Sequence, residues 1–142
     1  MKSFNSIIVI NSLGDKLLMC KRSKEPYIGL YNFVGGKREE GETAIQGAYR
    51  ELFEETGISP DNIALLHLMD FVYPIDDCEV TVFAGRLRGE VTLVEEAHNL
   101  YWIDVDGHNF FDMSRFGGEG DIGHMMEHVK LHRGKIDAMT RT

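Results

Sequence analysis

Short runs of apolar residues, separated by turn residues, recur along most of the chain. The longest clean run is Ile-Ile-Val-Ile at residues 7–10, inside a β-rich stretch. Residues 11–15 have turn composition, so residues 3–11 and 16–22 are predicted to form a β-hairpin. The predicted strands are residues 3–11, 16–22, 32–34, 63–73, 79–88, 91–94 and 100–103.

At residues 43–56 the apolar spacing changes to that of a helix. Ile45, Tyr49, Leu52 and Thr56 recur at helical intervals, and Gly57 follows as a predicted C-terminal stop. A second helix is predicted at residues 121–131. Its expected N-cap is Asp121, and its expected apolar face is Ile122, Met125, Met126 and Val129.

Together these elements predict an α/β (α+β) chain in which helices flank a mixed sheet. At 142 residues, the sequence is expected to form a single domain over residues 1–142. The composition, 43% hydrophobic and 27% charged, excludes a disordered chain. The run at residues 7–10 is far too short to cross a bilayer, so no membrane partner is expected.

The cysteine and charge content narrow the class of protein. Cys20 and Cys78 are too few for a disulfide framework and are expected to be buried, reduced thiols of a cytoplasmic protein. No signal peptide is expected, because no long apolar segment follows Met1. Against 15 Lys and Arg stand 23 Asp and Glu, a formal net charge of −8, which argues against a nucleic-acid polymer as partner. A single nucleotide is not excluded, because carboxylates that hold a cation can reverse the local charge.

The acidic residues are concentrated on the first predicted helix. Glu51, Glu54 and Glu55 are spaced i, i+3 and i+4, so their carboxylates share one face and one turn. Like charges at this spacing destabilise a helix, whereas a hard divalent cation such as Mg²⁺ or Mn²⁺ would turn the repulsion into binding. The alternative at this stage is a solvated acidic face. The glycine pair Gly35-Gly36 precedes the helix and lets the backbone approach a ligand closely.

The run Gly36-x5-Glu42-x7-Arg50-Glu51-Leu52-x-Glu54-Glu55-x-Gly57-Ile58 resembles the signature of the Nudix hydrolases. All nine specified positions agree over 23 residues, at defined spacing. The resemblance implies an α/β/α sandwich with a mixed sheet, in which the signature forms a loop–helix–loop. It also implies hydrolysis of a nucleoside diphosphate linked to another group, X, with a divalent cation that neutralises the phosphates and acidifies a bound water.

The resemblance also implies roles for individual residues. The metal ligands are expected to be Glu51, Glu54, Glu55 and the carbonyl of Gly35, with Mg²⁺ as cofactor and Mn²⁺ as an alternative. One of these glutamates, or Glu95 or Glu96 in a later loop, is expected to be the general base, and an exposed acidic turn is the alternative for that loop. Arg50 is expected to orient a glutamate, while Gly36, Glu42 and Gly57 are expected to support the signature structurally.

The surrounding segments resemble those of enzymes that hydrolyse nucleoside triphosphates, oxidised ones included, to monophosphate and pyrophosphate. Asn32 is expected to pair with a base edge, Arg22 and Lys37 to meet phosphates, and Trp102 to stack on the base. A strand-end hydrogen bond, solvation and core packing are the respective alternatives. Hydrolysis of ADP-ribose or a nucleotide sugar, and a non-catalytic nucleotide-binding module, remain open, as does a monomer or homodimer.

Two further patterns near the C-terminal end of the sequence could indicate a zinc site and an anion site. His124, Glu127 and His128 match the H-x-x-E-H pattern of zinc peptidases, but few residues follow to supply a third ligand. A polar helix face is the preferred interpretation. The glycine-rich residues 116–120 carry an acidic residue, Glu119, and are therefore expected to form a loop bordering the pocket rather than an anion site.

Overall fold

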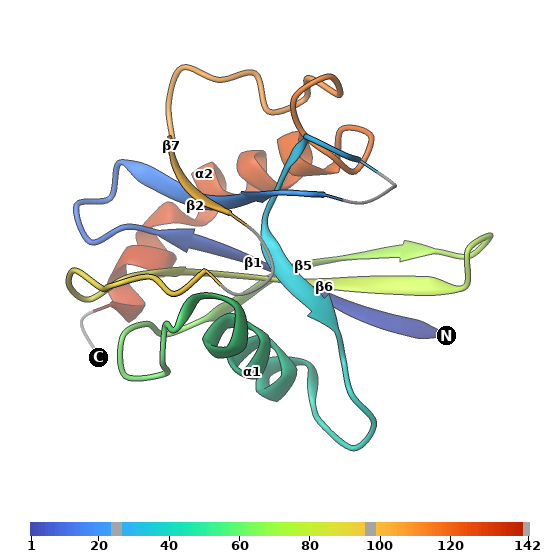
Figure 1. Ribbon diagram of the computed structural model, residues 1–142, viewed down its shortest axis with the longest axis horizontal. Helices are drawn as coiled ribbons and strands as arrows, with labels where there is room; N and C mark the ends of the chain where they lie inside the picture. The colour runs from blue at the N-terminus through green and yellow to red at the C-terminus, as the bar shows by residue number, and fades with distance from the viewer. Residues whose placement is uncertain (24–26, 96–98, 141–142) are drawn as a thin grey trace.

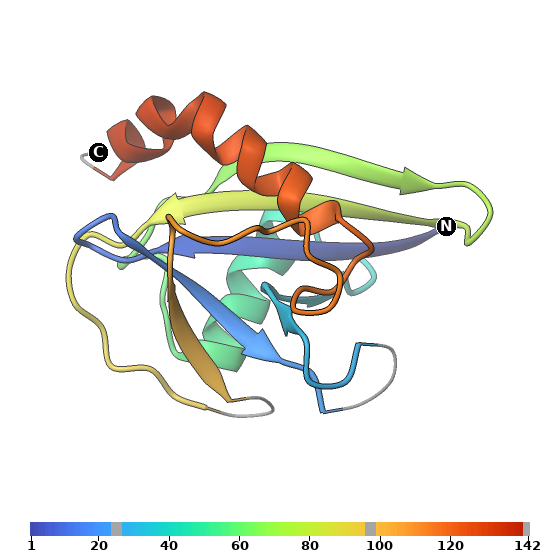
Figure 2. The same cartoon turned by 90° about the horizontal axis from the view of Figure 1, so that it is seen from above.

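The computed structural model describes residues 1–23, 27–95 and 99–140 of the chain. A mixed sheet lies between two helices: α1 (Ala44–Thr56) covers one face and α2 (Asp121–Met139) covers the other (Figures 1 and 2). This arrangement confirms the predicted sandwich. The strands are β1 (Lys2–Ile10), β2 (Lys16–Lys21), β3 (Tyr31–Asn32), β4 (Val34–Lys37), β5 (Leu66–Tyr73), β6 (Cys78–Arg86) and β7 (Leu100–Asp104).

Strand β1 lies at the centre of the sheet. It runs parallel to β6 along its whole length, from the Lys2–Cys78 pair to the Ile10–Arg86 pair. Its other edge is divided, because Phe4 to Ile7 pair with β4 and Ile10 pairs with β2 in the predicted hairpin. The main path through the sheet is β3-β2-β1-β6-β5, and β7 joins the outer edge of β2.

Alternate side chains of β1 enter two separate cores. Ile8 and Ile10 face α2, whereas Ile7 and Val9 face α1, and all four are fully buried. A strand covered on both faces is expected to be continuously apolar, which accounts for the run at residues 7–10. The sheet thus holds the two helices at fixed positions on its opposite faces.

Local signals define both ends of α1. The Thr43 hydroxyl accepts a hydrogen bond from the Gln46 backbone N–H at 3.2 Å, and the Gln46 side chain accepts one from the Thr43 N–H at 2.9 Å. This capping box satisfies two of the free donors at the start of a helix. At the other end Gly57 adopts the left-handed conformation (φ 79°), which glycine accommodates without steric cost, and ends the helix as predicted.

Three details of the sequence prediction are wrong. Residues 32–34 are not one strand: β3 ends at Asn32, Phe33 intervenes, and β4 contains the glycine pair that was expected to follow the strand. Residues 91–94 form no strand, because the Val94 N–H donates to the carbonyl of Thr56 at 2.9 Å and the segment packs against the end of α1. Ile45 is 37% exposed, since the buried face of α1 is Gly47, Ala48, Leu52 and Thr56.

The second helix also differs from the prediction. It continues past Leu131 to Met139, changes direction at His132 (φ −116°, ψ 15°), and buries Ile136 as a further apolar anchor. Its N-cap is Gly120 rather than Asp121, whose carboxylate instead accepts a hydrogen bond from the Tyr73 hydroxyl. The predicted apolar face, Ile122, Met125, Met126 and Val129, is buried.

Both cysteines are free thiols, but only Cys20 is buried. Cys78, the first residue of β6, is half-buried. The expectation of two buried thiols is therefore wrong for Cys78. Among the described residues, neither helix has an apolar stretch long enough to cross a membrane.

Candidate active site

The guanidinium of Arg50 lies at the centre of the acidic face of α1. Its Nη1 atom is 3.0 Å from Glu51 Oε1 and 3.1 Å from Glu54 Oε2. Its Nε and Nη2 atoms donate to the two carboxylate oxygens of Glu42 at 3.0 and 2.7 Å, a bidentate pairing. A single side chain thus connects the loop before the helix to two carboxylates of the helix itself.

Glu42 is held firmly in this network. Besides Arg50, its Oε1 atom accepts the backbone N–H of Glu39 at 2.7 Å, and only 15% of its side chain is exposed. The hydrogen bonds from Arg50, followed by that from the Glu39 backbone, lower the pKa of Glu42 to about 2. This carboxylate is therefore ionised at any working pH, and its hydrogen bonds join the loop before α1 to the helix.

Glu55 has a different environment from its neighbours. It lies in the space between α1 and the sheet, where burial, followed by the charge of Glu51, raises its pKa to about 7. The backbone N–H of Gly35 donates to Glu55 and opposes the rise, while a hydrogen bond between the Glu55 and Glu51 side chains adds to it. The neighbouring Glu51 thus favours the protonated form of Glu55.

The glycine pair allows this close approach. A Cβ atom on Gly36 would lie 2.7–2.8 Å from the carboxylate atoms of Glu51. A Cβ atom on Gly35 would collide with the carbonyl oxygen of Asn5 on β1. A side chain therefore does not fit at Gly35, and one at Gly36 would displace the Glu51 carboxylate, which packs directly on the backbone of β4.

The donor set fits a hard divalent cation. Three carboxylates within one helical turn supply the oxygen ligands that Mg²⁺ and Mn²⁺ prefer, and a bound cation would favour their ionised forms. Within the part of the chain that the structure describes, no three acidic, histidine or cysteine side chains already converge as a cation cage. Glu51 and Glu54 instead accept hydrogen bonds from Arg50.

A cavity of about 320 Å³ opens beside these carboxylates. Glu55, Gly35 and Gly36 line one part of it, and Arg22 and Asn32 line another. An adjoining cavity of about 340 Å³ shares Asn32 with the first and extends between the sheet and the start of α2. The residues common to both cavities are Tyr27, Asn32, Phe33 and Val80. Residues of the signature, Gly36 and Glu55, therefore line a cavity that leads into a second, aromatic-lined one, and together the two have a size that suits a nucleotide.

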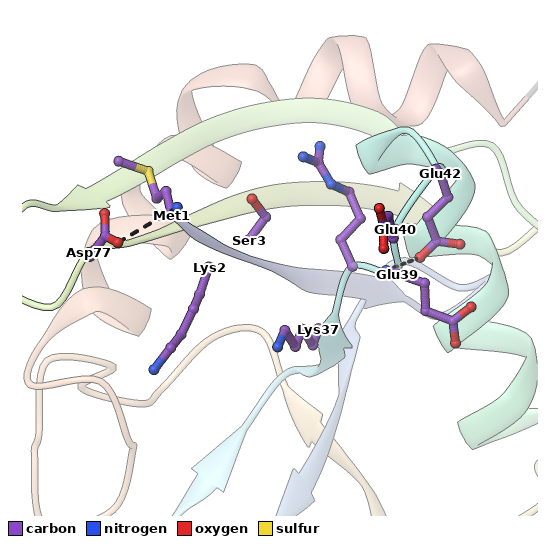
Figure 3. A pocket seen from close by; sticks show the side chains of 10 residues that line it. Met1, Lys2, Ser3, Lys37, Glu39, Glu40, Glu42 and Asp77 are labelled. Carbon is purple, nitrogen blue, oxygen red and sulfur yellow. Dashed lines mark hydrogen bonds and ion pairs between the residues drawn. The ribbon is translucent and has the colours of Figure 1, made fainter.

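The structure separates the other predicted substrate contacts. Lys37 lines a different cavity, of about 850 Å³, on the far side of the signature loop. Figure 3 shows Lys37 near Lys2 on the neighbouring strand, with Glu39, Glu40 and Glu42 at the other side of this cavity. Trp102, on β7, is 36% exposed and lines a hollow with Lys16 rather than the cavity of Glu55. Glu96 lies outside the described residues. Glu95 is the last described residue before it, and its side chain is exposed.

Two tyrosine–carboxylate pairs at the rim of the second cavity were missed by the sequence analysis. The Tyr27 hydroxyl donates to the carboxylate of Glu119 at 2.7 Å, and the Tyr73 hydroxyl donates to Asp121. The first pair joins the glycine-rich segment at residues 116–120 to the loop before β3, and the second joins the start of α2 to β5. Gly117, Gly118 and Glu119 line the cavity, which agrees with the expectation that this segment borders the pocket. The paired residues are 92 and 48 positions apart, so no local signal could have linked them.

The histidine pattern on α2 does not form a peptidase site. The rings of His124 and His128 lie 5.3 Å apart, but Glu127 pairs with Lys130 at 3.8 Å on an exposed face. Met125 and Val129 form the opposite, buried face. The histidines therefore follow the polar face of the helix, as the preferred interpretation held.

Comparison with known proteins identifies the family. The family model described as the NUDIX domain matches residues 2–118, which contain the carboxylate helix, the glycine pair and most of the sheet. The chain belongs to the Nudix family. Members of this family generally need divalent metal ions, which agrees with the oxygen donors found here.

Named relatives of this Nudix chain include a NAD-capped RNA hydrolase, NudC, from Haemophilus influenzae, which is 33% identical over 135 residues, 93% of this chain and 49% of the relative. The 8-oxo-dGTP diphosphatase of Escherichia coli is 31% identical over 108 residues, 73% of this chain and 81% of the relative. The chain spans about half the length of the first of these relatives. In fold, it is similar to an Ap4A hydrolase from Caenorhabditis elegans, with a TM-score of 0.74, 14% identity and coverage of 95% of this chain and 99% of the other.

The raised pKa of Glu55 predicts how the metal-free protein responds to pH. Because the folded state holds this proton up to about pH 7 and an unfolded glutamate loses it near its ordinary value of 4.5, stability should fall as pH rises between these values. Glu55→Gln should remove this decline and raise the melting temperature in EDTA at pH 8. Mg²⁺ should stabilise the wild type more at pH 8 than at pH 6, and should stabilise the variant little.

Melting curves between pH 5 and 8, in EDTA or Mg²⁺, measure both effects. Glu127→Gln, an exposed change on α2, is the matched control and should leave both unchanged. A melting temperature of Glu55→Gln below that of the wild type, in EDTA at pH 8, would contradict the raised pKa of Glu55.

Proposed function

We propose that this protein hydrolyses the pyrophosphate linkage of a nucleoside diphosphate joined to a group X. The observation that carries the proposal is the carboxylate face of α1, completed by Arg50 and Glu42, together with the nucleotide-sized cavity that one of its members, Glu55, lines. A non-catalytic binding module would not require three mutually repelling carboxylates beside its ligand. The complete signature therefore favours an enzyme.

In this proposal Glu51, Glu54, Glu55 and the carbonyl of Gly35 hold the divalent cation, with Mg²⁺ as the ion and Mn²⁺ as its substitute. The cation, when bound, neutralises phosphate oxygens and lowers the pKa of a water ligand. Glu54, Glu51 or Glu96 takes the proton of the attacking water, because a carboxylate within reach of that water can accept it. Arg50 keeps the carboxylates oriented and limits their mutual repulsion.

The remaining residues bind and orient the substrate. Arg22 and Asn32 line the same cavity as Glu55, so we assign the phosphate chain to the side of Arg22 and the base to the side of Asn32. The aromatic residues that lead into the second cavity, Tyr27 and Phe33, exclude water from the base. Lys37 and Trp102 line other hollows, and their proposed contacts therefore depend on parts of the substrate outside this cavity.

For the group X we propose the γ-phosphate of a nucleoside triphosphate, an oxidised purine nucleotide included, so that hydrolysis between the α- and β-phosphates releases pyrophosphate. The similarity to the E. coli 8-oxo-dGTP diphosphatase supports this choice, because the match spans 81% of that protein. A second candidate is a dinucleotide linkage of the NAD type, which the similarity to NudC over 93% of this chain favours. Hydrolysis of ADP-ribose or a nucleotide sugar is the further alternative.

A hydrolysis screen in Mg²⁺ separates these candidates. It should include ordinary and oxidised nucleoside triphosphates, NAD, ADP-ribose, nucleotide sugars and dinucleoside polyphosphates, each with an EDTA control. The proposal predicts metal-dependent release of pyrophosphate and a nucleoside monophosphate from a triphosphate. Two monophosphate products from NAD or ADP-ribose would shift the assignment to those substrates, and binding without turnover would overturn the proposed activity.

A further inference from the structure

One face of α2 carries three histidines at intervals of about one turn, His124, His128 and His132. The ring centroids of His124 and His128 lie 5.3 Å apart, and those of His128 and His132 lie 6.2 Å apart. Residues four positions apart are neighbours on the surface of a helix, which accounts for both contacts. The imidazoles therefore form a continuous row on the polar side of α2.

The two ring pairs in this row differ in geometry. The planes of His124 and His128 are inclined by 61°, whereas those of His128 and His132 are inclined by only 20° and are stacked. An imidazole binds a metal ion through a nitrogen lone pair, which lies in the plane of the ring. Lone pairs of inclined rings can converge on one ion, but those of stacked rings lie in separate planes. His132 also departs from helical geometry (φ −116°, ψ 15°), so the first pair is the one that suits an ion.

The ring nitrogens of this pair are not engaged by other side chains. Within the described part of the chain, neither His124 nor His128 forms a side-chain hydrogen bond or an ion pair. His67, by contrast, pairs with Asp70 at 2.8 Å. His124 is exposed and His128 is half-buried, so solvent ions have access to the pair. Both imidazoles are thus available as ligands.

Imidazole nitrogens select a different ion from the carboxylates of α1. Nitrogen donors suit Zn²⁺, Ni²⁺ and Cu²⁺, whereas Mg²⁺ prefers oxygen. Because one helix carries both rings, binding to the first places the ion at a high effective concentration for the second. No third acidic, histidine or cysteine side chain of the described residues completes a cluster with them, so water fills the remaining positions around the ion. The pair is therefore a two-ligand clamp rather than a closed structural site.

We propose that His124 and His128 form a second metal site, which binds a divalent transition ion such as Zn²⁺ or Ni²⁺. The site lies on α2, across the sheet from the carboxylates of α1 (Figure 2). Ile122 and Met125, in the same turns of α2, line the second cavity, as does Phe71, whose ring centroid is 6.2 Å from that of His124. A bound ion links two turns and so stiffens the part of α2 that forms a wall of this cavity.

Calorimetric titration with Ni²⁺ tests the proposal, on protein without an affinity tag and in excess Mg²⁺. His124→Gln and His128→Gln should each weaken the binding of one Ni²⁺ at least about tenfold, because loss of even an outer partner of a metal ligand costs that much. Ni²⁺ that displaces Mg²⁺ from the carboxylates would bind the wild type and both variants alike. His132→Gln, one turn further along the same face, is the matched control and should keep the wild-type affinity within about threefold, the scale of an ordinary surface substitution.

Thermal melting in the same buffer gives a second readout. Ni²⁺ should raise the melting temperature of the wild type and of His132→Gln, because an ion that binds the folded state stabilises it. It should raise that of His124→Gln and His128→Gln less, since neither variant can clamp the ion between two turns. Melting without Ni²⁺ shows whether each variant is folded.

Three results would overturn the proposal. The first is a wild type that binds no Ni²⁺ in excess Mg²⁺. The second is wild-type affinity in either His124→Gln or His128→Gln, and the third is a loss in His132→Gln as large as that in His124→Gln. None of these measurements involves nucleotide hydrolysis, so the outcome is independent of the proposed function.

Discussion

Glu54→Gln lowers metal-dependent turnover by about two to four orders of magnitude, the range expected for loss of a positioned acid–base or metal-binding carboxylate. Glu54 belongs to the carboxylate face, and its side chain is 57% exposed at the mouth of the site. Glutamine keeps the shape of the residue but removes the charge that a cation or an attacking water requires. The kcat with the best substrate from the screen measures the effect.

The fold should survive this substitution. Among the described residues, the Glu54 side chain accepts one hydrogen bond, from Arg50 at 3.1 Å, and substitutions at such exposed positions usually change stability by less than about 0.5 kcal/mol. A melting temperature close to that of the wild type therefore separates lost chemistry from lost structure. Glu127→Gln, at an equally exposed helical position, should keep full turnover. Unchanged turnover in Glu54→Gln would remove this residue from the proposed site.

Arg50→Met has the second large expected effect, because it acts on both stability and turnover. Arg50 is 21% exposed and is the cation within reach of four carboxylates, those of Glu39, Glu42, Glu51 and Glu54. Without it, Glu42 and Glu51, each only 15% exposed, lose a hydrogen-bond donor, and the neighbouring carboxylates repel one another. We expect the melting temperature at pH 7 to fall by several degrees and turnover to fall at least about tenfold.

The loss of stability in Arg50→Met should depend on pH. The pKa of Glu42 is about 2 in the folded protein, against an ordinary value of 4.5, so its pairing with Arg50 stabilises the fold fully above pH 4.5. That contribution is lost as the pH falls toward 2. The difference in melting temperature between the wild type and Arg50→Met should therefore be full at pH 7 and shrink below pH 4.5.

Arg50→Lys is the matched control, since it keeps the positive charge but cannot bridge two carboxylates with a planar fork. We expect it to lie between the wild type and Arg50→Met in both melting temperature and turnover. A melting temperature of Arg50→Met equal to that of the wild type at pH 7 would show that the network does not stabilise the signature.

Features carried by neighbouring residues could be predicted from the sequence. The helix at residues 43–56 and its stop at Gly57 depend on spacing and on one backbone conformation, and both are correct. The carboxylate face follows from the i, i+3, i+4 spacing of three glutamates. Family resemblance then supplied the sandwich, which apolar spacing alone left as a sheet flanked by helices.

Features that depend on distant partners could not be predicted in this way. Residues 91–94 have the composition of a strand, but the backbone of Val94 bonds to Thr56 instead of to another strand. The burial of the Asn5 amide gave no local signal, because the residues that lie against it include Gly36 and Gly47, more than thirty positions away. The proposed substrate contacts of Lys37 and Trp102 stay predictions.

The most direct test of the central claim follows the products of a nucleoside triphosphate by phosphorus-31 nuclear magnetic resonance, with protein in Mg²⁺ and in EDTA. The claim is that the carboxylate face of α1 uses a divalent cation to hydrolyse a nucleotide pyrophosphate linkage. It predicts equal amounts of nucleoside monophosphate and pyrophosphate in Mg²⁺, and no reaction in EDTA or with Glu54→Gln. Release of orthophosphate and nucleoside diphosphate, or turnover that persists in EDTA, would contradict it.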